Sequence, residues 1–217
     1  MAKIIDKINA LEILDMGICD YRLALEKQFE LCSLRQKDSI ADTVILVEHP
    51  AVITLGARQS ANRLLTSEAD LGKLDIAVVP LRRGGGSTAH NPGQMVFYPI
   101  IHLNQRQLGI NKYIRTLEQI GIELLSRCGV SAQRTKGLPG LWIGGKKIAS
   151  IGVKVSHFVT YHGMAININN DLKIFDYIIP CGLDGVKMTS AAKETGRTTP
   201  MDEVKRILSG ILVEHFA

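Results

Sequence analysis

A Gly-Gly pair between two short apolar runs does most to restrict how this chain can fold. Residues 141–143 and 146–148 flank Gly144 and Gly145. Two strand-like runs joined by two glycines are typical of a β-hairpin, because the tight turn needs left-handed backbone that glycine adopts without steric cost. The second run continues through Val155. The sequence therefore predicts a long antiparallel strand directly after the turn.

Three longer segments carry apolar residues at helical spacing. In the first, residues 19–36, the expected packing face comprises Tyr21, Leu25, Phe29 and Cys32. The second runs to Cys128, with Gly129 as its C′ residue, and the third begins with Thr199 as N-cap and Pro200 at N1. The apolar residues that define the second and third helices are Tyr113, Ile114, Leu117, Ile120, Gly121, Leu124, Leu125, Val204, Ile207, Leu208, Ile211 and Leu212.

The remaining apolar runs have strand length, with a brief helix expected near Ser67. They cover residues 11–16, 43–48, 51–55, 76–81, 95–103 and 161–168. About seven or eight strands mixed with three main helices favour an α+β fold over a doubly wound sheet. No repeat or linker divides the chain, so we expect one domain over residues 1–217.

Composition excludes several classes of protein. The net charge is +5, but the 26 basic residues are scattered and aromatic residues make up only 5%, unlike a nucleic-acid binder. The N-terminus has no signal-peptide pattern and no apolar run reaches membrane-helix length, so a cytoplasmic protein without a membrane segment is expected. Cys19, Cys32, Cys128 and Cys181 form no Cys-x-x-Cys pair or zinc-ligand spacing. We therefore expect neither disulfides nor a metal.

A glycine-rich stretch at residues 82–94 is the first candidate for chemistry. Arg82 and Arg83 precede three consecutive glycines, whose amides can approach a ligand closely. The stretch lacks the residues of a P-loop and of a dinucleotide fingerprint. It is either a ligand-binding loop or a flexible connection.

Cys181 and Lys147 are the candidates for covalent chemistry. Cys181, between Pro180 and Gly182, is the only cysteine that we expect outside a helix, and it is either an exposed nucleophile or a half-buried thiol. Lys147 shares a strand face with Ala149, Ile151 and Val153, so it either extends its amine to solvent or serves a function. His90 and His162 are either structural histidines or functional ones.

Four stretches, taken together, resemble the lipoyl(octanoyl) transferase family. They span about residues 44 to 196, and their order and spacing make the resemblance specific. They are residues 48–56 (EHPAVITLG); Arg83-Gly84-Gly85 through Thr88, His90 and Pro92-Gly93-Gln94; residues 145–152 (GKKIASIG) with 161–167 (YHGMAIN); and Pro180-Cys181-Gly182 followed by Met188-Thr189-Ser190.

The resemblance implies a fold similar to the catalytic domain of biotin and lipoate protein ligases. It implies transfer of an octanoyl (or lipoyl) group from acyl carrier protein to a lysine of lipoyl domains, in 2-oxoacid dehydrogenase E2 subunits and the glycine cleavage H protein. Cys181 would form the acyl thioester with Lys147 as its partner, and no cofactor would be needed. The residues matching the acyl pocket are Arg83, Gly84, Gly85, Gly86, Ser87, Thr88, Ala89, His90, Ser150, Ile151, Gly152, Gly163, Met164 and Ala165.

The chain departs from the family pattern at Ala89 and Asn91, where tyrosine and glycine are common, so we ask whether these two residues alter the pocket. An ATP-dependent lipoate or biotin ligase is the alternative, since that chemistry needs the lysine and the glycine-rich loop but no cysteine. A non-catalytic binder of an acyl group or lipoyl domain is a third interpretation. It would not need Cys181 and Lys147 together.

Overall fold

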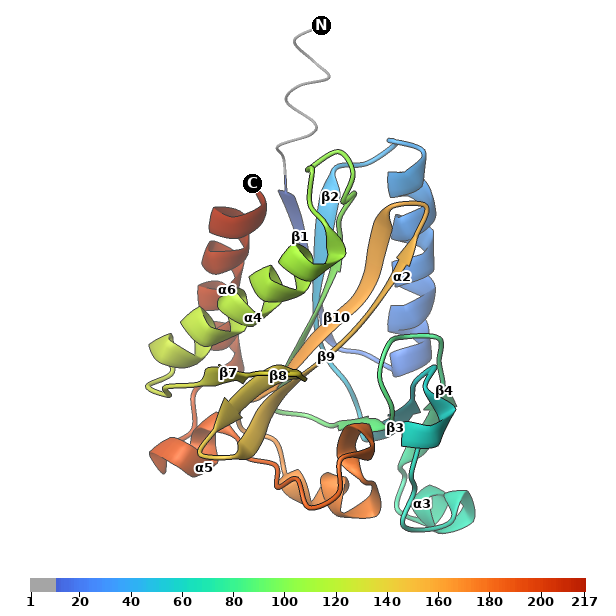
Figure 1. Ribbon diagram of the computed structural model, residues 1–217, viewed down its shortest axis with the longest axis vertical. Helices are drawn as coiled ribbons and strands as arrows, with labels where there is room; N and C mark the ends of the chain where they lie inside the picture. Colours follow the sequence, from blue (N-terminus) through green and yellow to red (C-terminus); the bar gives the residue numbers. More distant parts are fainter. Residues whose placement is uncertain (1–10) are drawn as a thin grey trace, which may run out of the picture.

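The structure, a computed structural model, describes residues 11–217 and contains two β-sheets packed with helices (Figure 1). The larger sheet has seven strands, in the spatial order β1 (Leu11–Ile18), β2 (Asp42–Glu48), β6 (Gln94–Ile100), β10 (Val159–Asn167), β9 (Lys146–Ser156), β8 (Leu138–Ile143) and β7 (Gln133–Thr135). The smaller sheet has the order β4 (Ala77–Pro80), β3 (Val52–Leu55) and β5 (Thr88–His90). β1–β2 and β3–β4 pair in parallel and the other neighbours are antiparallel, which confirms the predicted α+β class.

Three long helices cover the two faces of the larger sheet. They are α2 (Tyr21–Gln36), α4 (Ile110–Arg127) and α6 (Met201–Phe216), and the shorter helices are α3 (Glu68–Lys73), α5 (Ala191–Thr195) and the 3₁₀ turns Gln59–Ala61, Leu172–Tyr177 and Pro180–Gly182. α2 lies on one face of the sheet, and α4 and α6 lie on the other (Figure 1). Within residues 11–217, no helix is both long and apolar enough to cross a membrane.

The central strands are buried on both sides by this arrangement. Successive side chains of a strand point to opposite faces, so Val44 and Leu46 of β2 join the core under α4 and α6, whereas Ile45 and Val47 pack toward α2. All seven residues of β2, and all seven of β6, are buried. This double burial explains why these strands appear in the sequence as unbroken apolar runs.

The predicted β-hairpin is confirmed. Gly144 and Gly145 have φ of 51° and 80° and join β8 to β9, with Trp142 opposite Lys147. This pairing places Lys147 two residues after the turn, next to the 178–189 segment. Its amide donates to the carbonyl of Lys187 at 2.8 Å. The tight turn thus sets where Lys147 lies.

Several predicted details were wrong. Phe29 is 50% exposed, and the buried side of α2 includes Gln28 and Arg35, because the sheet offers polar partners to both. Cys19 precedes α2, so Cys181 is not the only cysteine outside a helix. Residues 11–217 form ten strands rather than seven or eight, with β5 inside the stretch expected to be a loop. The last helix is preceded by Pro200 without a side-chain cap, and Thr199 does not act as N-cap.

β10 breaks away from β6 at Pro99, which has no amide to donate. In the register set by Met164 and Phe97, His162 falls opposite this proline. His162 adopts a left-handed φ of 56°, and its amide donates to Gln28 Oε1 of α2 at 2.8 Å instead of to the neighbouring strand. The interruption turns the His162 backbone toward α2.

Candidate active site

Cys181 lies in a tight turn whose backbone is strained. Its φ is 56°, a conformation that costs a non-glycine residue about 1–3 kcal/mol unless the surroundings hold it. Two hydrogen bonds hold it here. The Cys181 amide donates to the carbonyl of Ser87 at 2.9 Å, and Arg58 Nη2 donates to the Cys181 carbonyl at 2.9 Å. The residue is partly exposed to solvent.

Lys147 meets this cysteine although 34 positions separate them in the sequence. The Lys147 side chain is buried, with the residue only 2% exposed, and its Nζ lies 3.7 Å from Cys181 Sγ. The same Nζ donates to the Pro139 carbonyl at 3.1 Å and lies 5.1 Å from the ring centre of Trp142. None of the ion pairs among residues 11–217 involves Lys147. A nearby ammonium favours the thiolate form of a cysteine.

Arg83 is a second buried cation beside the cysteine, 6% exposed. Its Nη1 donates to the carbonyls of Gly84 and Gly86, at 3.1 and 2.9 Å, and its Nη2 donates to the Thr54 carbonyl and hydroxyl, at 2.9 and 2.6 Å. Its Nε has no partner within the described residues. Burial lowers the pKa of Arg83. The four acceptors of its hydrogen bonds are three carbonyl oxygens and one hydroxyl, which are all neutral.

An inner pocket opens beside Cys181 and gathers ten of the fourteen residues predicted to line the acyl pocket. Those ten are Arg83, Gly85, Thr88, His90, Ser150, Ile151, Gly152, Gly163, Met164 and Ala165. The other lining residues are Tyr21, Val96, Tyr98, His162 and Cys181. The free volume is about 30 Å³, room for two or three waters.

The other four predicted residues do not line this pocket. Gly84 lines the outer cleft described below. Ser87 holds the cysteine turn, because its hydroxyl donates to the Ile179 carbonyl at 2.9 Å while its carbonyl accepts from Cys181. Gly86 packs on Ala61, whose carbonyl oxygen would be 2.2 Å from an added Cβ.

Ala89 and Asn91, the two departures from the family pattern, also lie away from the inner pocket. Ala89 is fully buried in the apolar cluster under the smaller sheet. Asn91 donates from Nδ2 to the Asp171 carbonyl at 2.8 Å, and its Oδ1 accepts from Asn170. Neither residue therefore contributes to the wall of the inner pocket.

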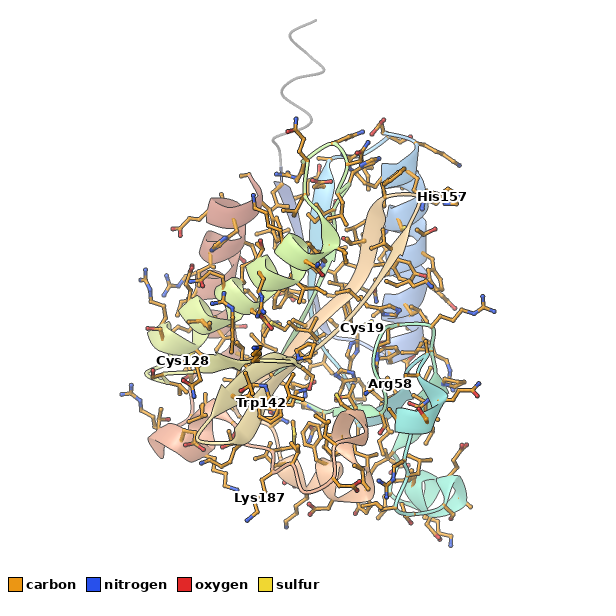
Figure 2. The ribbon with its side chains drawn as sticks, in the orientation of Figure 1. Cys19, Arg58, Cys128, Trp142, His157 and Lys187 are labelled. Carbon is orange, nitrogen blue, oxygen red and sulfur yellow. The ribbon has the colours of Figure 1, made fainter. Side chains whose placement is uncertain are left out.

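An outer cleft of about 390 Å³ adjoins the inner pocket and contains Lys147. The two cavities share Cys181, Gly85, Ile151 and Gly152. Figure 2 shows Arg58 and Trp142 in the half of the molecule away from His157, between His157 and Lys187. The cysteine thus lies where the open cleft meets the inner pocket.

Buried histidines and tyrosines line the inner pocket, namely His90, His162, Tyr21 and Tyr98, and His49 contacts the two tyrosine rings. His49 Nε2 is 2.8 Å from the Tyr98 hydroxyl, and His90 Nδ1 is 2.7 Å from Gln94 Oε1. Burial lowers the pKa of His49 to about 4 and that of His162 to about 3, and it holds the pKa of His90 well below its usual value. These imidazoles are therefore neutral near pH 7 and leave the cationic charge to Arg83 and Lys147.

Sequence reasoning missed Arg58, Tyr21 and Tyr98. Arg58 reaches the site only because residues 58–61 pack on the cysteine turn: a Cβ added to Gly182 would be 2.8 Å from Ala61 Cα. Tyr21 was interpreted only as a helix packing residue. No local pattern distinguishes such residues from ordinary surface or core positions. Across residues 11–217, no three His, Cys, Asp or Glu side chains are grouped as metal ligands would be.

Known proteins resemble this chain in sequence. The family model described as "Lipoyl protein ligase A/B catalytic domain" matches residues 20–213. The octanoyltransferase of Maridesulfovibrio salexigens is 39% identical over 197 residues, which cover 91% of this chain and 92% of that protein. The octanoyltransferase of Roseiflexus sp. (strain RS-1) is 42% identical over 212 residues, 96% of this chain and 88% of that protein.

A solved structure shares the fold at much lower identity. The crystal structure of P. falciparum LipL1 in complex with lipoate superposes with a TM-score of 0.76 at 14% identity, over 95% of this chain. This chain spans 62% of that protein's length. The similarity extends to the arrangement of sheets and helices.

Proposed function

Because this chain belongs to the lipoyl protein ligase A/B catalytic domain family and is an acyltransferase like its octanoyltransferase relatives, we propose that it transfers the octanoyl group through a thioester on Cys181. The observation that carries this proposal is the 3.7 Å approach of Lys147 Nζ to Cys181 Sγ at the mouth of a pocket. A ligase that activates its acid with ATP needs the lysine but has no use for this sulfur.

The proposed first step is attack of the Cys181 thiolate on the carbonyl of an octanoyl thioester carried by acyl carrier protein. Lys147 stabilises the thiolate, and its ammonium gives a proton to the departing carrier sulfur. The bond from the acyl carbon to the carrier breaks as the bond to Sγ forms. Thioesters on the carrier and on the enzyme are similar in energy, so this step is close to reversible.

The proposed second step is attack by the lysine amine of a lipoyl domain on the enzyme thioester. Lys147, now neutral, accepts the proton that the attacking nitrogen loses, and Cys181 leaves as thiolate. The amide product is more stable than the thioester, which drives the cycle forward. The expected acceptors are lipoyl domains of 2-oxoacid dehydrogenase E2 subunits and the glycine cleavage H protein, and the expected compartment is the cytoplasm.

The remaining pocket residues bind and orient the acyl chain in this proposal. Ile151, Met164, Ala165 and Val96 supply the apolar wall, while the bare backbone at Gly152 and Gly163 lets neighbouring groups approach closely. At Gly152, an added Cβ would be 3.0 Å from Arg83 Cδ. Any side chain there would narrow a pocket that already has little free space.

The test is intact mass measurement after incubation with octanoyl acyl carrier protein in the absence of nucleotide. We expect one octanoyl group on the wild-type protein and on Cys19→Ala, a matched control because Cys19 is also partly exposed. We expect none on Cys181→Ala. An adduct that persists on Cys181→Ala, or transfer that requires ATP, would refute the proposal, and the second result would favour the ligase.

A further inference from the structure

Three cavities lie in a row through this part of the molecule. The outer cleft and the inner pocket meet at Cys181, Gly85, Ile151 and Gly152. On its far side, the inner pocket shares a single lining residue, His162, with a groove of about 370 Å³. Cys181 therefore marks the entrance of the inner pocket, and His162 separates its deep end from the groove.

The His162 side chain lines both cavities, but no hydrogen bond among residues 11–217 holds its Nδ1. The residue is 2% exposed. Its ring contacts are aromatic, with the ring centres of Tyr98 and Tyr161 at 6.4 and 4.9 Å. The backbone is held by the bond from the His162 amide to Gln28. The ring can therefore change rotamer without losing a hydrogen bond within the described residues.

The groove behind this wall is apolar. It is lined by Leu25, Phe29, Pro80, Leu81, Arg82, Tyr161 and His162. Phe29 is 50% exposed and packs edge-on against Tyr161, at 5.6 Å between ring centres. Arg82 is the only charged residue among those lining it. An exposed apolar groove next to a pocket for a hydrocarbon chain is a suitable place for further carbons of that chain.

We propose that His162 is the end wall of the acyl pocket, and that the groove behind it receives the distal carbons of saturated acyl chains longer than octanoyl when the ring moves aside. This inference rests on the proposed function, because it takes the inner pocket as the acyl site. The wild-type ring excludes longer chains by occupying the passage. Chain-length preference is then set by one side chain at the far end from the reacting sulfur.

The test compares dodecanoyl with octanoyl acyl carrier protein as donors. The variant His162→Gly removes the ring and suits the left-handed φ of 56°. Burying a methylene strengthens binding about fourfold. For four extra methylenes in a half-open groove, we expect the dodecanoyl-to-octanoyl ratio of Cys181 acylation rates to rise at least tenfold over wild type. An unchanged ratio would overturn the inference.

A second variant keeps the test decisive if His162→Gly does not fold. Asparagine also tolerates left-handed backbone and is smaller than histidine, so His162→Asn should raise the ratio in the same direction by a smaller factor. Wild-type protein that fails to form octanoyl-Cys181 contradicts the proposed function itself. Normal wild-type acylation with an unchanged ratio in the folded variant contradicts only the role of His162.

The groove is tested separately by charge. In the His162→Gly background, Phe29→Asp places a carboxylate on the groove wall and should remove most of the gain for the dodecanoyl donor. The matched control is Phe158→Asp, at an aromatic residue 60% exposed in the turn between β9 and β10, outside the groove. We expect this control to keep the gain. Equal losses in the two double variants would show that the groove does not hold the chain.

Discussion

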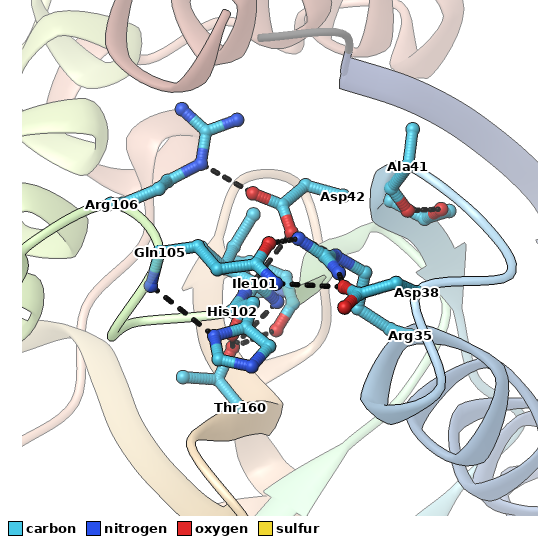
Figure 3. A network of polar contacts seen from close by, with 11 residues as sticks. Arg35, Asp38, Ala41, Asp42, Ile101, His102, Gln105, Arg106 and Thr160 are labelled. Atoms are coloured by element: carbon cyan, nitrogen blue, oxygen red, sulfur yellow. Dashed lines mark hydrogen bonds and ion pairs between the residues drawn. The ribbon is translucent and has the colours of Figure 1, made fainter. Parts of the chain in front are cut away.

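Two buried groups of charges in this molecule are built in opposite ways. Near the start of β2, the fully buried carboxylate of Asp42 accepts from Arg35 Nε at 2.7 Å, from Arg106 Nε and from the His102 amide at 3.0 Å (Figure 3). Arg35 also pairs with Asp38 and donates to Gln105. In this network each buried charge has a partner of opposite sign.

At the cysteine site, two buried cations have neutral acceptors instead. Arg83 donates to carbonyls and a hydroxyl, and Lys147 donates to a carbonyl and approaches the Cys181 sulfur. In the described part of the chain, neither takes part in an ion pair. Burying a charge without a counter-ion is unfavourable. The site therefore has a positive potential that a thiolate or an oxyanion would relieve.

The comparison teaches that buried charge serves stability in one region and chemistry in the other. Charges that are already paired stabilise an additional anion only weakly. Cations without a counter-ion lower the energy of an anion formed beside them. If this is right, removing charge from the two regions should separate stability from activity.

The largest effect is expected for Lys147→Met. Loss of the ammonium should slow acylation of Cys181 by octanoyl acyl carrier protein about 10²–10⁴-fold, the usual contribution of a positioned proton donor. The free energy of unfolding should change by no more than about 1 kcal/mol, because an apolar side chain of similar length replaces a charge without an ionic partner. Single-turnover mass measurement and urea unfolding give the two values. Full activity in this variant would contradict the comparison.

The reverse pattern is expected for Asp42→Asn. This change leaves Arg35 and Arg106 facing a neutral group, and breaking a buried pair destabilises a protein by about 3–5 kcal/mol. Urea unfolding measures the loss, while the acylation rate per folded molecule should stay within about twofold of wild type. A loss of unfolding free energy below about 1 kcal/mol would show that the network contributes little to stability.

As the pH falls, protonation of buried histidines should destabilise the protein before protonation of the carboxylates does. Burial lowers the pKa of His49 to about 4, that of His162 to about 3 and that of His90 well below its usual value, so between about pH 4 and pH 6.5 the unfolded chain binds more protons than the folded one. Stability therefore falls as the pH falls through that window, by about 1 kcal/mol for each histidine at pH 5.5. The pKa of Asp38 is also lowered, but its protonation reduces stability only when the pH falls below about the usual value of 3.8.

Unfolding in urea at pH 7.5 and 5.5 measures this loss for wild type and His162→Asn. The variant should lose about 1 kcal/mol less between the two pH values, since one of the three histidines with a lowered pKa is gone. Identical losses would mean that His162 is not buried in its neutral form.

The smallest effect is expected at the exposed rim of the site. Arg58→Gln removes the donor to the Cys181 carbonyl and should slow acylation several-fold, because the strained turn becomes less well held. Arg63→Gln is the matched control: it breaks an exposed ion pair with Asp184 in the same two segments but touches no atom of Cys181. Exposed pairs contribute at most about 1 kcal/mol, so this control should acylate normally. Equal rates in the two variants would deny Arg58 a positioning role.

Much of the fold was predictable because its signals are local. The glycine pair identified the β8–β9 hairpin, and helical spacing identified α4 and α6. The errors fall where a residue far away in the sequence determines the local structure. Gln28 and Arg35 turned to the buried side of α2 because His162 and Asp42 bind them, and β5 formed because β3 lies beside it.

By itself, the sequence determined the main secondary structure, the mixed fold class and which residues have the chemistry for acyl transfer, since turn geometry and side-chain periodicity depend on neighbours along the chain. Only the tertiary structure decided that Lys147 lies 3.7 Å from Cys181, that Arg58 donates to the carbonyl of the strained turn, and that His162 lines both the inner pocket and the groove. These are contacts between segments far apart in the chain. Their distances depend on how the sheets and helices pack together.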